Sequence, residues 1–111
     1  MRENIKGGAL TESTFYILLS LYSPNHGYGI IKFVEQETRG RVLLGAGTLY
    51  GAVNTLLKKG WICSYGDQEG VRKKEYLITE VGKEMVSKEM QRLAEIYESG
   101  LRIIGEGNQN D

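Results

Sequence analysis

The spacing of apolar residues predicts three short helices in the first sixty residues. A first helix begins after Thr11, whose hydroxyl suits the N-cap, and turn-forming residues at 23–27 end it. A second helix is expected from Tyr28 to Thr38 and a third from Thr48 to Lys59, and a glycine suited to a helix end lies just after each. Their apolar faces consist of Phe15, Leu18, Leu19 and Tyr22, of Ile30 or Ile31, Phe33 and Val34, and of Leu49, Val53, Leu56 and Leu57.

The period of the pattern changes to that of strands between residues 61 and 78. Residues 61–65 and 74–78 predict two strands, and a glycine-bounded tip at 66–73 joins them into a β-hairpin. Thr79 then suits the N-cap of a last helix that runs to about residue 104. Three helices, a hairpin and a further helix are the element order of a winged helix-turn-helix.

The last helix carries apolar residues at spacings close to a heptad repeat. At 1.5 Å per residue it is ~35 Å long, longer than so small a domain needs. We therefore expect it to pair with a second copy of the chain, although the same face could instead fold back on its own core. The residues of this predicted dimer interface are Val86, Met90, Leu93, Tyr97, Leu101 and Ile104.

The predicted fold is mainly α with a small β-hairpin: a winged helix-turn-helix plus a long C-terminal helix. An N-terminal arm covers residues 1–10, the winged helix-turn-helix DNA-binding domain covers 11–79, and the dimerisation helix covers 80–104. Gly100 is expected to weaken or bend the end of that helix, and residues 105–111 are expected to form a flexible tail.

Composition narrows the class of protein. The chain has 111 residues, of which 41% are hydrophobic, enough for one packed domain and too few for two ordinary ones. A single cysteine and a single histidine exclude a disulfide framework and a multi-cysteine zinc site, so no metal or cofactor is expected. The apolar runs are too short to span a membrane, and the polar N-terminus is unlike a signal peptide. We expect a cytoplasmic protein.

Charge is balanced overall but unevenly distributed. Fourteen basic residues match fourteen acidic ones, which excludes a uniformly basic nucleic-acid binder. Residues 1–78 hold ten basic and seven acidic side chains, a balance of +3, whereas residues 79–111 hold four and seven, a balance of −3. Basic pairs and triplets at 58–59 and 72–74 therefore predict a local positive field on the N-terminal part.

The third helix has a polar, cationic face opposite its apolar one, which is typical of a helix that enters the DNA major groove. Threonine can hydrogen-bond a base or contact a thymine methyl, and asparagine can pair with adenine. Lysines at the end of the helix suit phosphates, and the Tyr50 hydroxyl is expected to reach a phosphate from the rim of this face. The alternative is an ordinary solvated helix surface. The candidate DNA-binding residues are Thr48, Tyr50, Gly51, Asn54, Thr55, Lys58 and Lys59.

Two further segments are candidates for DNA contact. Arg72, Lys73 and Lys74 lie at the hairpin tip, and strand alternation predicts that Arg72 and Lys74, or Lys73, face the backbone. The alternative is a hairpin whose charges only prevent aggregation. Tyr28, at the start of the second helix, could assist phosphate binding by the helix amides, or pack beneath a helix capped by His26.

Three segments resemble the signature blocks of the PadR family of transcriptional regulators: HGYGII at 26–31, GTLY at 47–50 and KEYLITEVG at 74–82. The resemblance covers about residues 10–100. It implies a homodimeric bacterial winged-helix protein that binds double-stranded DNA, usually as a repressor, often released by a small molecule or a stress signal. The chain departs from the family pattern at Gly51, where proline is common, and at Glu75, beside Tyr76. We expect these departures to weaken DNA binding or make it more sensitive to salt.

The resemblance also implies a candidate site for a small-molecule effector. Family members bind planar aromatics between the first and last helices at the dimer interface. The residues here that could line such a cavity are Phe15, Tyr16, Tyr22, Met90 and Tyr97, although core and interface packing would explain them more simply. Cys63 is expected to be a small packing residue of its strand rather than a redox sensor.

The leading hypothesis is a sequence-specific transcriptional regulator, a repressor that binds an inverted-repeat operator as a homodimer through helix 48–59 and the wing at 66–74. The alternative is a dimeric winged-helix protein-interaction adaptor that has lost DNA binding, which Gly51, Glu75 and the neutral charge favour. An enzyme is not expected, because no nucleophile motif, metal-ligand cluster or phosphate-binding glycine loop is present in the sequence.

Overall fold

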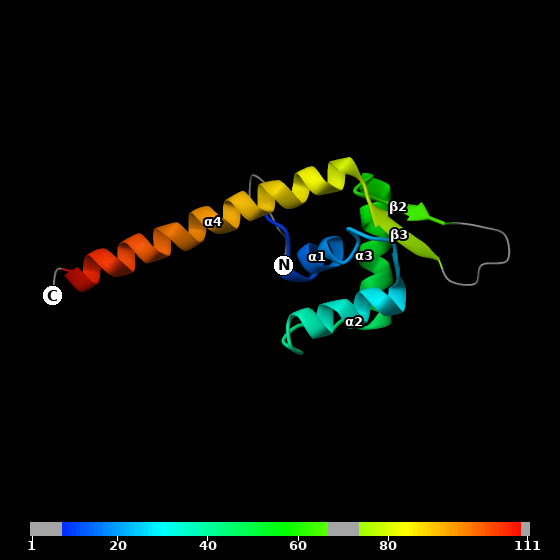
Figure 1. Ribbon diagram of the computed structural model, residues 1–111, viewed down its shortest axis with the longest axis horizontal. Helices are drawn as coiled ribbons and strands as arrows, with labels where there is room; N and C mark the ends of the chain where they lie inside the picture. The colour runs from blue at the N-terminus through cyan, green and yellow to red at the C-terminus, as the bar shows by residue number, and fades with distance from the viewer. Residues whose placement is uncertain (1–7, 67–73, 110–111) are drawn as a thin grey trace.

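The computed structural model describes residues 8–66 and 74–109 and has the predicted fold class, mainly helical with a small antiparallel sheet. Three helices and the sheet form a compact body, and the last helix projects far beyond it (Figure 1), so that the molecule measures 67 × 27 × 27 Å. In chain order the elements are α1 (Glu12–Leu19), β1 (Asn25–His26), α2 (Gly27–Glu37), α3 (Ala46–Lys59), β2 (Ile62–Tyr65), β3 (Glu75–Ile78) and α4 (Glu80–Gln109).

Side-chain caps start three of the four helices. The Thr11 hydroxyl accepts from the Thr14 amide at 3.1 Å, and His26 Nδ1 accepts from the Gly29 amide at 3.2 Å. Thr79 caps α4 in the same way, by accepting from the Gly82 amide at 3.1 Å. Each of these polar residues satisfies an N–H group that a helix start leaves without a partner, which is why each helix begins there.

Two predicted helix boundaries were wrong. The third helix begins at Ala46 rather than Thr48, because Gly45 takes the extended N-cap conformation without any side-chain hydrogen bond. The last helix continues to Gln109, beyond its predicted end at 104, so residues 105–109 of the predicted tail are helical. A glycine inside a helix costs only about 1 kcal/mol relative to alanine, which is too little to end a helix by itself.

The sheet has one strand more than the predicted hairpin. β2 and β3 pair antiparallel as expected, and β1 adds to the free side of β3 to give the order β1-β3-β2. Asn25 pairs with Tyr76 and His26 with Glu75. A strand of two residues is too short to show the alternation of apolar and polar positions that predicts a strand. Its surrounding sequence, Pro-Asn-His, is typical of a turn. The added strand joins the wing to the start of α2.

The core lies where α1, α2, α3, the sheet and the first turns of α4 meet. On the predicted apolar face of α1, Leu18 is buried and Phe15 and Leu19 are half-buried against the core, whereas Tyr22 is exposed and its neighbour Leu21 is buried in its place, together with Ile17. The fully or nearly buried apolar side chains are Ile17, Leu18, Leu21, Ile30, Val34, Leu44, Leu49, Val53, Leu56, Ile62, Tyr76, Ile78 and Val86. None of the helices in the described ranges is both long and apolar enough to cross a bilayer.

The base of α4 is fixed to the end of α3 and the start of β2. The Thr79 amide donates to the Trp61 carbonyl at 2.9 Å, and the Thr79 hydroxyl donates to the Gly60 carbonyl at 2.7 Å. Gly82, one turn further on, is buried directly against the Trp61 carbonyl. The direction in which α4 leaves the body is therefore set by close backbone contacts.

Glu89 attaches the N-terminal arm to α4. Its side chain is only 4% exposed and accepts from Arg92 Nε at 3.0 Å, from Arg92 Nη2, and from the Leu10 amide at 3.2 Å. These hydrogen bonds, with the Arg92 guanidinium as the largest cause, lower the pKa of Glu89 below its ordinary value of 4.5. The ionised carboxylate is therefore the form that stabilises the fold.

Glu89→Gln is expected to lower the free energy of unfolding at pH 7 by about 2 kcal/mol, because it removes a charged acceptor from a buried position. Because the folded pKa is lowered, this stabilisation is present above the ordinary value of 4.5 and is lost as pH falls through the folded pKa. Urea unfolding at a series of pH values checks this. The gap between wild type and variant should close in acid, and the exposed Glu84→Gln should show no such gap at pH 7. An equal gap at all pH values would contradict the role given to the carboxylate.

Candidate nucleic-acid interface

The exposed face of α3 is polar and positively charged. Its apolar side is fixed in the core by Leu49, Val53 and Leu56, as predicted, which turns the opposite side to solvent. Four of the candidate residues are exposed and lie, by helical spacing, at the centre of that side, and Thr48 and Tyr50 lie at its edges. No carboxylate occurs anywhere in α3. The four central residues are Gly51, Asn54, Thr55 and Lys58, which we call the α3 face.

Lys59 lies apart from Lys58. Its Nζ is 4.8 Å from the centroid of the Trp61 ring, so the ammonium is held beside the end of α3 rather than on the α3 face. Both lysines lie in the last turn of α3, where the negative end of the helix dipole favours cations. The Thr55 hydroxyl donates to the Gly51 carbonyl at 3.2 Å, so its proton is already used within the helix.

Tyr50 reaches toward the start of α2. A Cβ atom placed on Gly27 would overlap the Tyr50 hydroxyl, so the ring crosses to the first turn of α2 and glycine is the residue that leaves room for it. The hydroxyl therefore lies beside the first turn of α2, where the sequence indicated a phosphate site, while Tyr50 as a whole is 46% exposed.

Tyr28 is 65% exposed, so the alternative that it packs beneath α2 is wrong. Lys32 Nζ lies 5.7 Å from the centroid of the Tyr28 ring and adds a cation to this surface. Lys32 was not among the residues predicted from sequence. It could have been found from its spacing of four residues from Tyr28, which places both residues on one side of a helix.

The base of the wing is described, whereas its tip is not. Lys74 is exposed at the start of β3, and the predicted contacts Arg72 and Lys73 lie outside the described residues. Glu75, half-buried, pairs across the sheet with His26 and Tyr65, which places one carboxylate directly after Lys74 at the base of the wing. Cys63 is exposed, and its predicted packing role is wrong because its neighbour Ile62 takes the inward position of the alternating strand.

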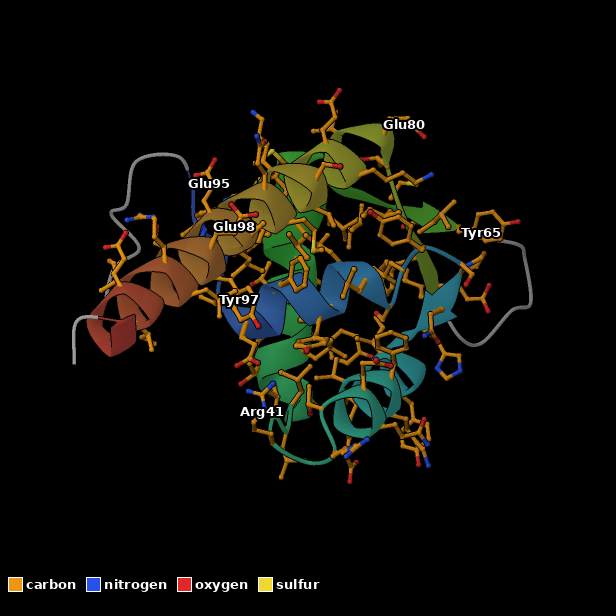
Figure 2. All side chains as sticks on the ribbon, turned by 60° about the vertical axis from the view of Figure 1, so that its left-hand side comes forward. Arg41, Tyr65, Glu80, Glu95, Tyr97 and Glu98 are labelled. Carbon is orange, nitrogen blue, oxygen red and sulfur yellow. The ribbon has the colours of Figure 1, made fainter. Side chains whose placement is uncertain are left out.

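The projecting part of α4 carries an exposed apolar stripe. Val86, predicted at the dimer interface, is only 5% exposed and belongs to the core of the chain itself, because α4 still lies against the body at that turn. Beyond it the helix leaves the body, and Tyr97 and Glu95 point from opposite sides of it (Figure 2). Ile96 and Ile103, which were not predicted from sequence, widen the stripe. Its members, all exposed, are Met90, Leu93, Ile96, Tyr97, Leu101, Ile103 and Ile104.

The predicted effector residues do not form one cavity within the subunit. Phe15 and Tyr16 line a cavity of about 280 Å³ beside Leu93, but Met90 and Tyr97 lie exposed on α4. Tyr22 is directed elsewhere, with Lys83 Nζ 5.8 Å from the centroid of its ring. The prediction that the five residues gather around one ligand is therefore not met within a single copy of the chain.

The fold and the α3 face define a winged-helix protein of the DNA-binding class. Residues 15–88 match the sequence family described as the transcriptional regulator PadR-like family. This match covers more than half of the chain, and the chain belongs to that family. Its members are transcriptional regulators rather than enzymes. No curated protein matches the sequence.

Solved structures agree with this assignment. A transcriptional regulator from Thermoplasma acidophilum is 27% identical, with 100% of this chain and 99% of that chain covered and a TM-score of 0.65. A PadR family regulator from Eggerthella lenta is 21% identical, with 82% and 80% covered and a TM-score of 0.69. PadR from Bacillus subtilis, solved in complex with operator DNA, is 21% identical, with 68% and 44% covered and a TM-score of 0.56.

Proposed function

We propose that the chain is a sequence-specific repressor that binds an inverted-repeat operator as a homodimer. The observation that carries the proposal is the α3 face: an exposed, polar, cationic helix surface without carboxylates, held in place by a buried opposite side. A related PadR structure was solved in complex with operator DNA, which supports the same use of this fold.

In this proposal α3 lies in the major groove and the cations around it bind phosphates. Asn54 has the amide that pairs with adenine, whereas Lys58 contributes affinity that does not depend on sequence. Phosphate contacts are expected from Lys59, from Lys74 at the base of the wing, and from Tyr28 at the start of α2. The neutral total charge is no obstacle, because the seven carboxylates that follow residue 78 belong to the other part of the chain.

The second copy of the chain covers the apolar stripe on α4. Its seven apolar side chains are exposed on a helix that projects from the body (Figure 1), and burying them is favourable by roughly 25 cal/mol per Å². A two-fold axis through paired α4 helices places two α3 helices on one side of the dimer. Half-sites about one helical turn apart, ~34 Å, then match the symmetry of an inverted repeat.

Two substitutions on the α3 face are expected to have different effects. Lys58→Gln should weaken binding to all duplexes about equally and lower the salt dependence of log K by about 0.9 for each phosphate that is no longer neutralised. Asn54→Ala should reduce discrimination against a changed base pair roughly 5- to 150-fold at the position it reads. The measurement is fluorescence anisotropy with duplexes selected from a random pool, at several salt concentrations.

Lys88→Gln provides the matched control, because it removes the same charge from an exposed position on α4 and should leave DNA binding unchanged. Binding that does not depend on salt, or a sequence preference unchanged in Asn54→Ala, would contradict the use of α3. A protein that selects no duplex at all would favour the interaction-adaptor alternative.

A further inference from the structure

The link between α2 and α3 presents an apolar side chain to solvent. Among the large apolar side chains of the described residues, Leu43 has the largest exposed fraction, 69%. Its neighbours along the chain point inward, because Leu44 is only 9% exposed and Val42 is half-buried against the core. The core is therefore closed without the side chain of Leu43, which also lies outside the α4 stripe.

Contacts on both sides hold the link in place. The buried Thr38 hydroxyl accepts from the Val42 amide at 3.1 Å and donates to the Val34 carbonyl at 2.8 Å. Leu43 lies between this hydrogen-bonded residue and the buried Leu44. The direction in which the Leu43 side chain leaves the link is therefore determined by the fold.

The start of α3, next to Leu43, is open. Leu43 lies two residues before Gly45, the N-cap of α3. The first two residues of the helix, Ala46 and Gly47, have the smallest side chains and are exposed. A Cβ atom placed on Gly45 or Gly47 would have no atom of the described residues within 4 Å. Another surface can therefore approach this end of α3 closely, and Leu43 is the large side chain beside it.

The charge of this part of the chain favours DNA as that surface. Residues 38–66 contain no aspartate or glutamate and four basic residues, Arg39, Arg41, Lys58 and Lys59. Arg41 forms an ion pair with Glu12, but all four basic residues are exposed. The link is also continuous with the α3 face, and the first residues of a recognition helix are the ones that contact base edges.

An apolar side chain in the major groove has one matching group on the base edges, the 5-methyl group of thymine. Against a leucine, the polar edge atoms of the other bases would lose hydrogen bonds to water without replacement. We propose that Leu43 is a specificity-determining residue that contacts a thymine methyl group beside the bases contacted by α3. This inference rests on the proposed function and adds to it a preference for thymine at one position of each half-site.

The operator selected from a random pool provides the test. Each thymine is replaced in turn by deoxyuridine, which forms the same base pair and lacks only the methyl group, and binding is measured by fluorescence anisotropy. At one thymine of each half-site, deoxyuridine should weaken binding of the wild-type protein about fourfold, as expected for one buried methyl group. Leu43→Ala should bind the thymine and deoxyuridine duplexes equally at that position, which isolates the contact between the two groups.

Val81→Ala is the matched control. Val81 is also an exposed apolar residue, but it lies in the first turn of α4. This variant should keep the fourfold preference for thymine. The midpoint of urea unfolding of Leu43→Ala should stay close to that of wild type, because the truncated side chain is exposed.

The possible failures separate this inference from the proposed function. Deoxyuridine effects that are the same in wild type and Leu43→Ala at every thymine would overturn the inference while operator binding stands. A selected half-site without thymine, or an equal loss of the preference in Val81→Ala, would overturn it as well. A protein that selects no duplex would contradict the proposed function and this inference with it.

Discussion

Tyr97→Glu is expected to convert the proposed dimer into monomers and to weaken operator binding at least about 100-fold. Tyr97 is 68% exposed in the subunit and lies near the middle of the α4 stripe, so pairing of two subunits would bury both copies. A glutamate there places two like charges in an apolar contact, and desolvation of each is costly. Separate subunits also lose the gain of linking two half-site contacts, which is of the order of 10²–10⁴.

Sedimentation equilibrium and anisotropy on the same samples measure both effects. Gln91→Glu is the matched control, because it introduces the same charge at an exposed position on the opposite side of α4. That variant should remain a dimer and bind the operator as wild type does. A Tyr97→Glu protein that stays dimeric would show that the subunits meet elsewhere.

Gly82→Ala is expected to lower the free energy of unfolding by about 3 kcal/mol, as overpacking of a closely packed site does. An added Cβ would overlap the carbonyl oxygen of Trp61 and come within 2.7 Å of Ile78 Cγ1. The carbonyl has little freedom to move away, because the Thr79 amide already donates to it. The added methyl group therefore has to push α4 away from the body or break that hydrogen bond.

Gly51→Ala, measured by urea unfolding at the same protein concentration, gives the contrast. Gly51 is also a helical glycine, but a Cβ there would have no atom within 4 Å. Its replacement should stabilise the protein by up to about 1 kcal/mol through helix propensity alone. If Gly82→Ala were as stable as Gly51→Ala, the close contact at the base of α4 would not be rigid.

The elements that sequence predicted best are those specified by local chemistry. Thr11, His26 and Thr79 act as caps because a hydroxyl or imidazole followed by free amides suffices to start a helix. β1 was overlooked because its two residues become a strand only through pairing with β3, some fifty residues away. The start of α3 was misplaced because Gly45 caps it without a side chain.

The same distinction between local chemistry and contacts of distant residues applies to the functional surface. The α3 face could be predicted, since Leu49, Val53 and Leu56 determine which side of the helix is buried. The attachment of the N-terminal arm to α4 could not, because the hydrogen bond between Leu10 and Glu89 joins opposite parts of the chain. Val86 shows the same limit: its heptad spacing is correct, but the point where α4 leaves the body decides that it packs inward.

In the proposed dimer, each α4 helix and its winged domain move together as one rigid unit. The reason is that Thr79 is hydrogen-bonded to both Gly60 and Trp61, so that a tilt of α4 moves the whole winged domain. From Tyr97 to Glu80 the helix is about 26 Å long, so a change of about 8° in the crossing angle moves the domain by about 3.6 Å. That displacement is close to the rise of one base pair, about 3.4 Å. A small angular change where two subunits meet is thus enough to shift the two reading helices by one step along the operator.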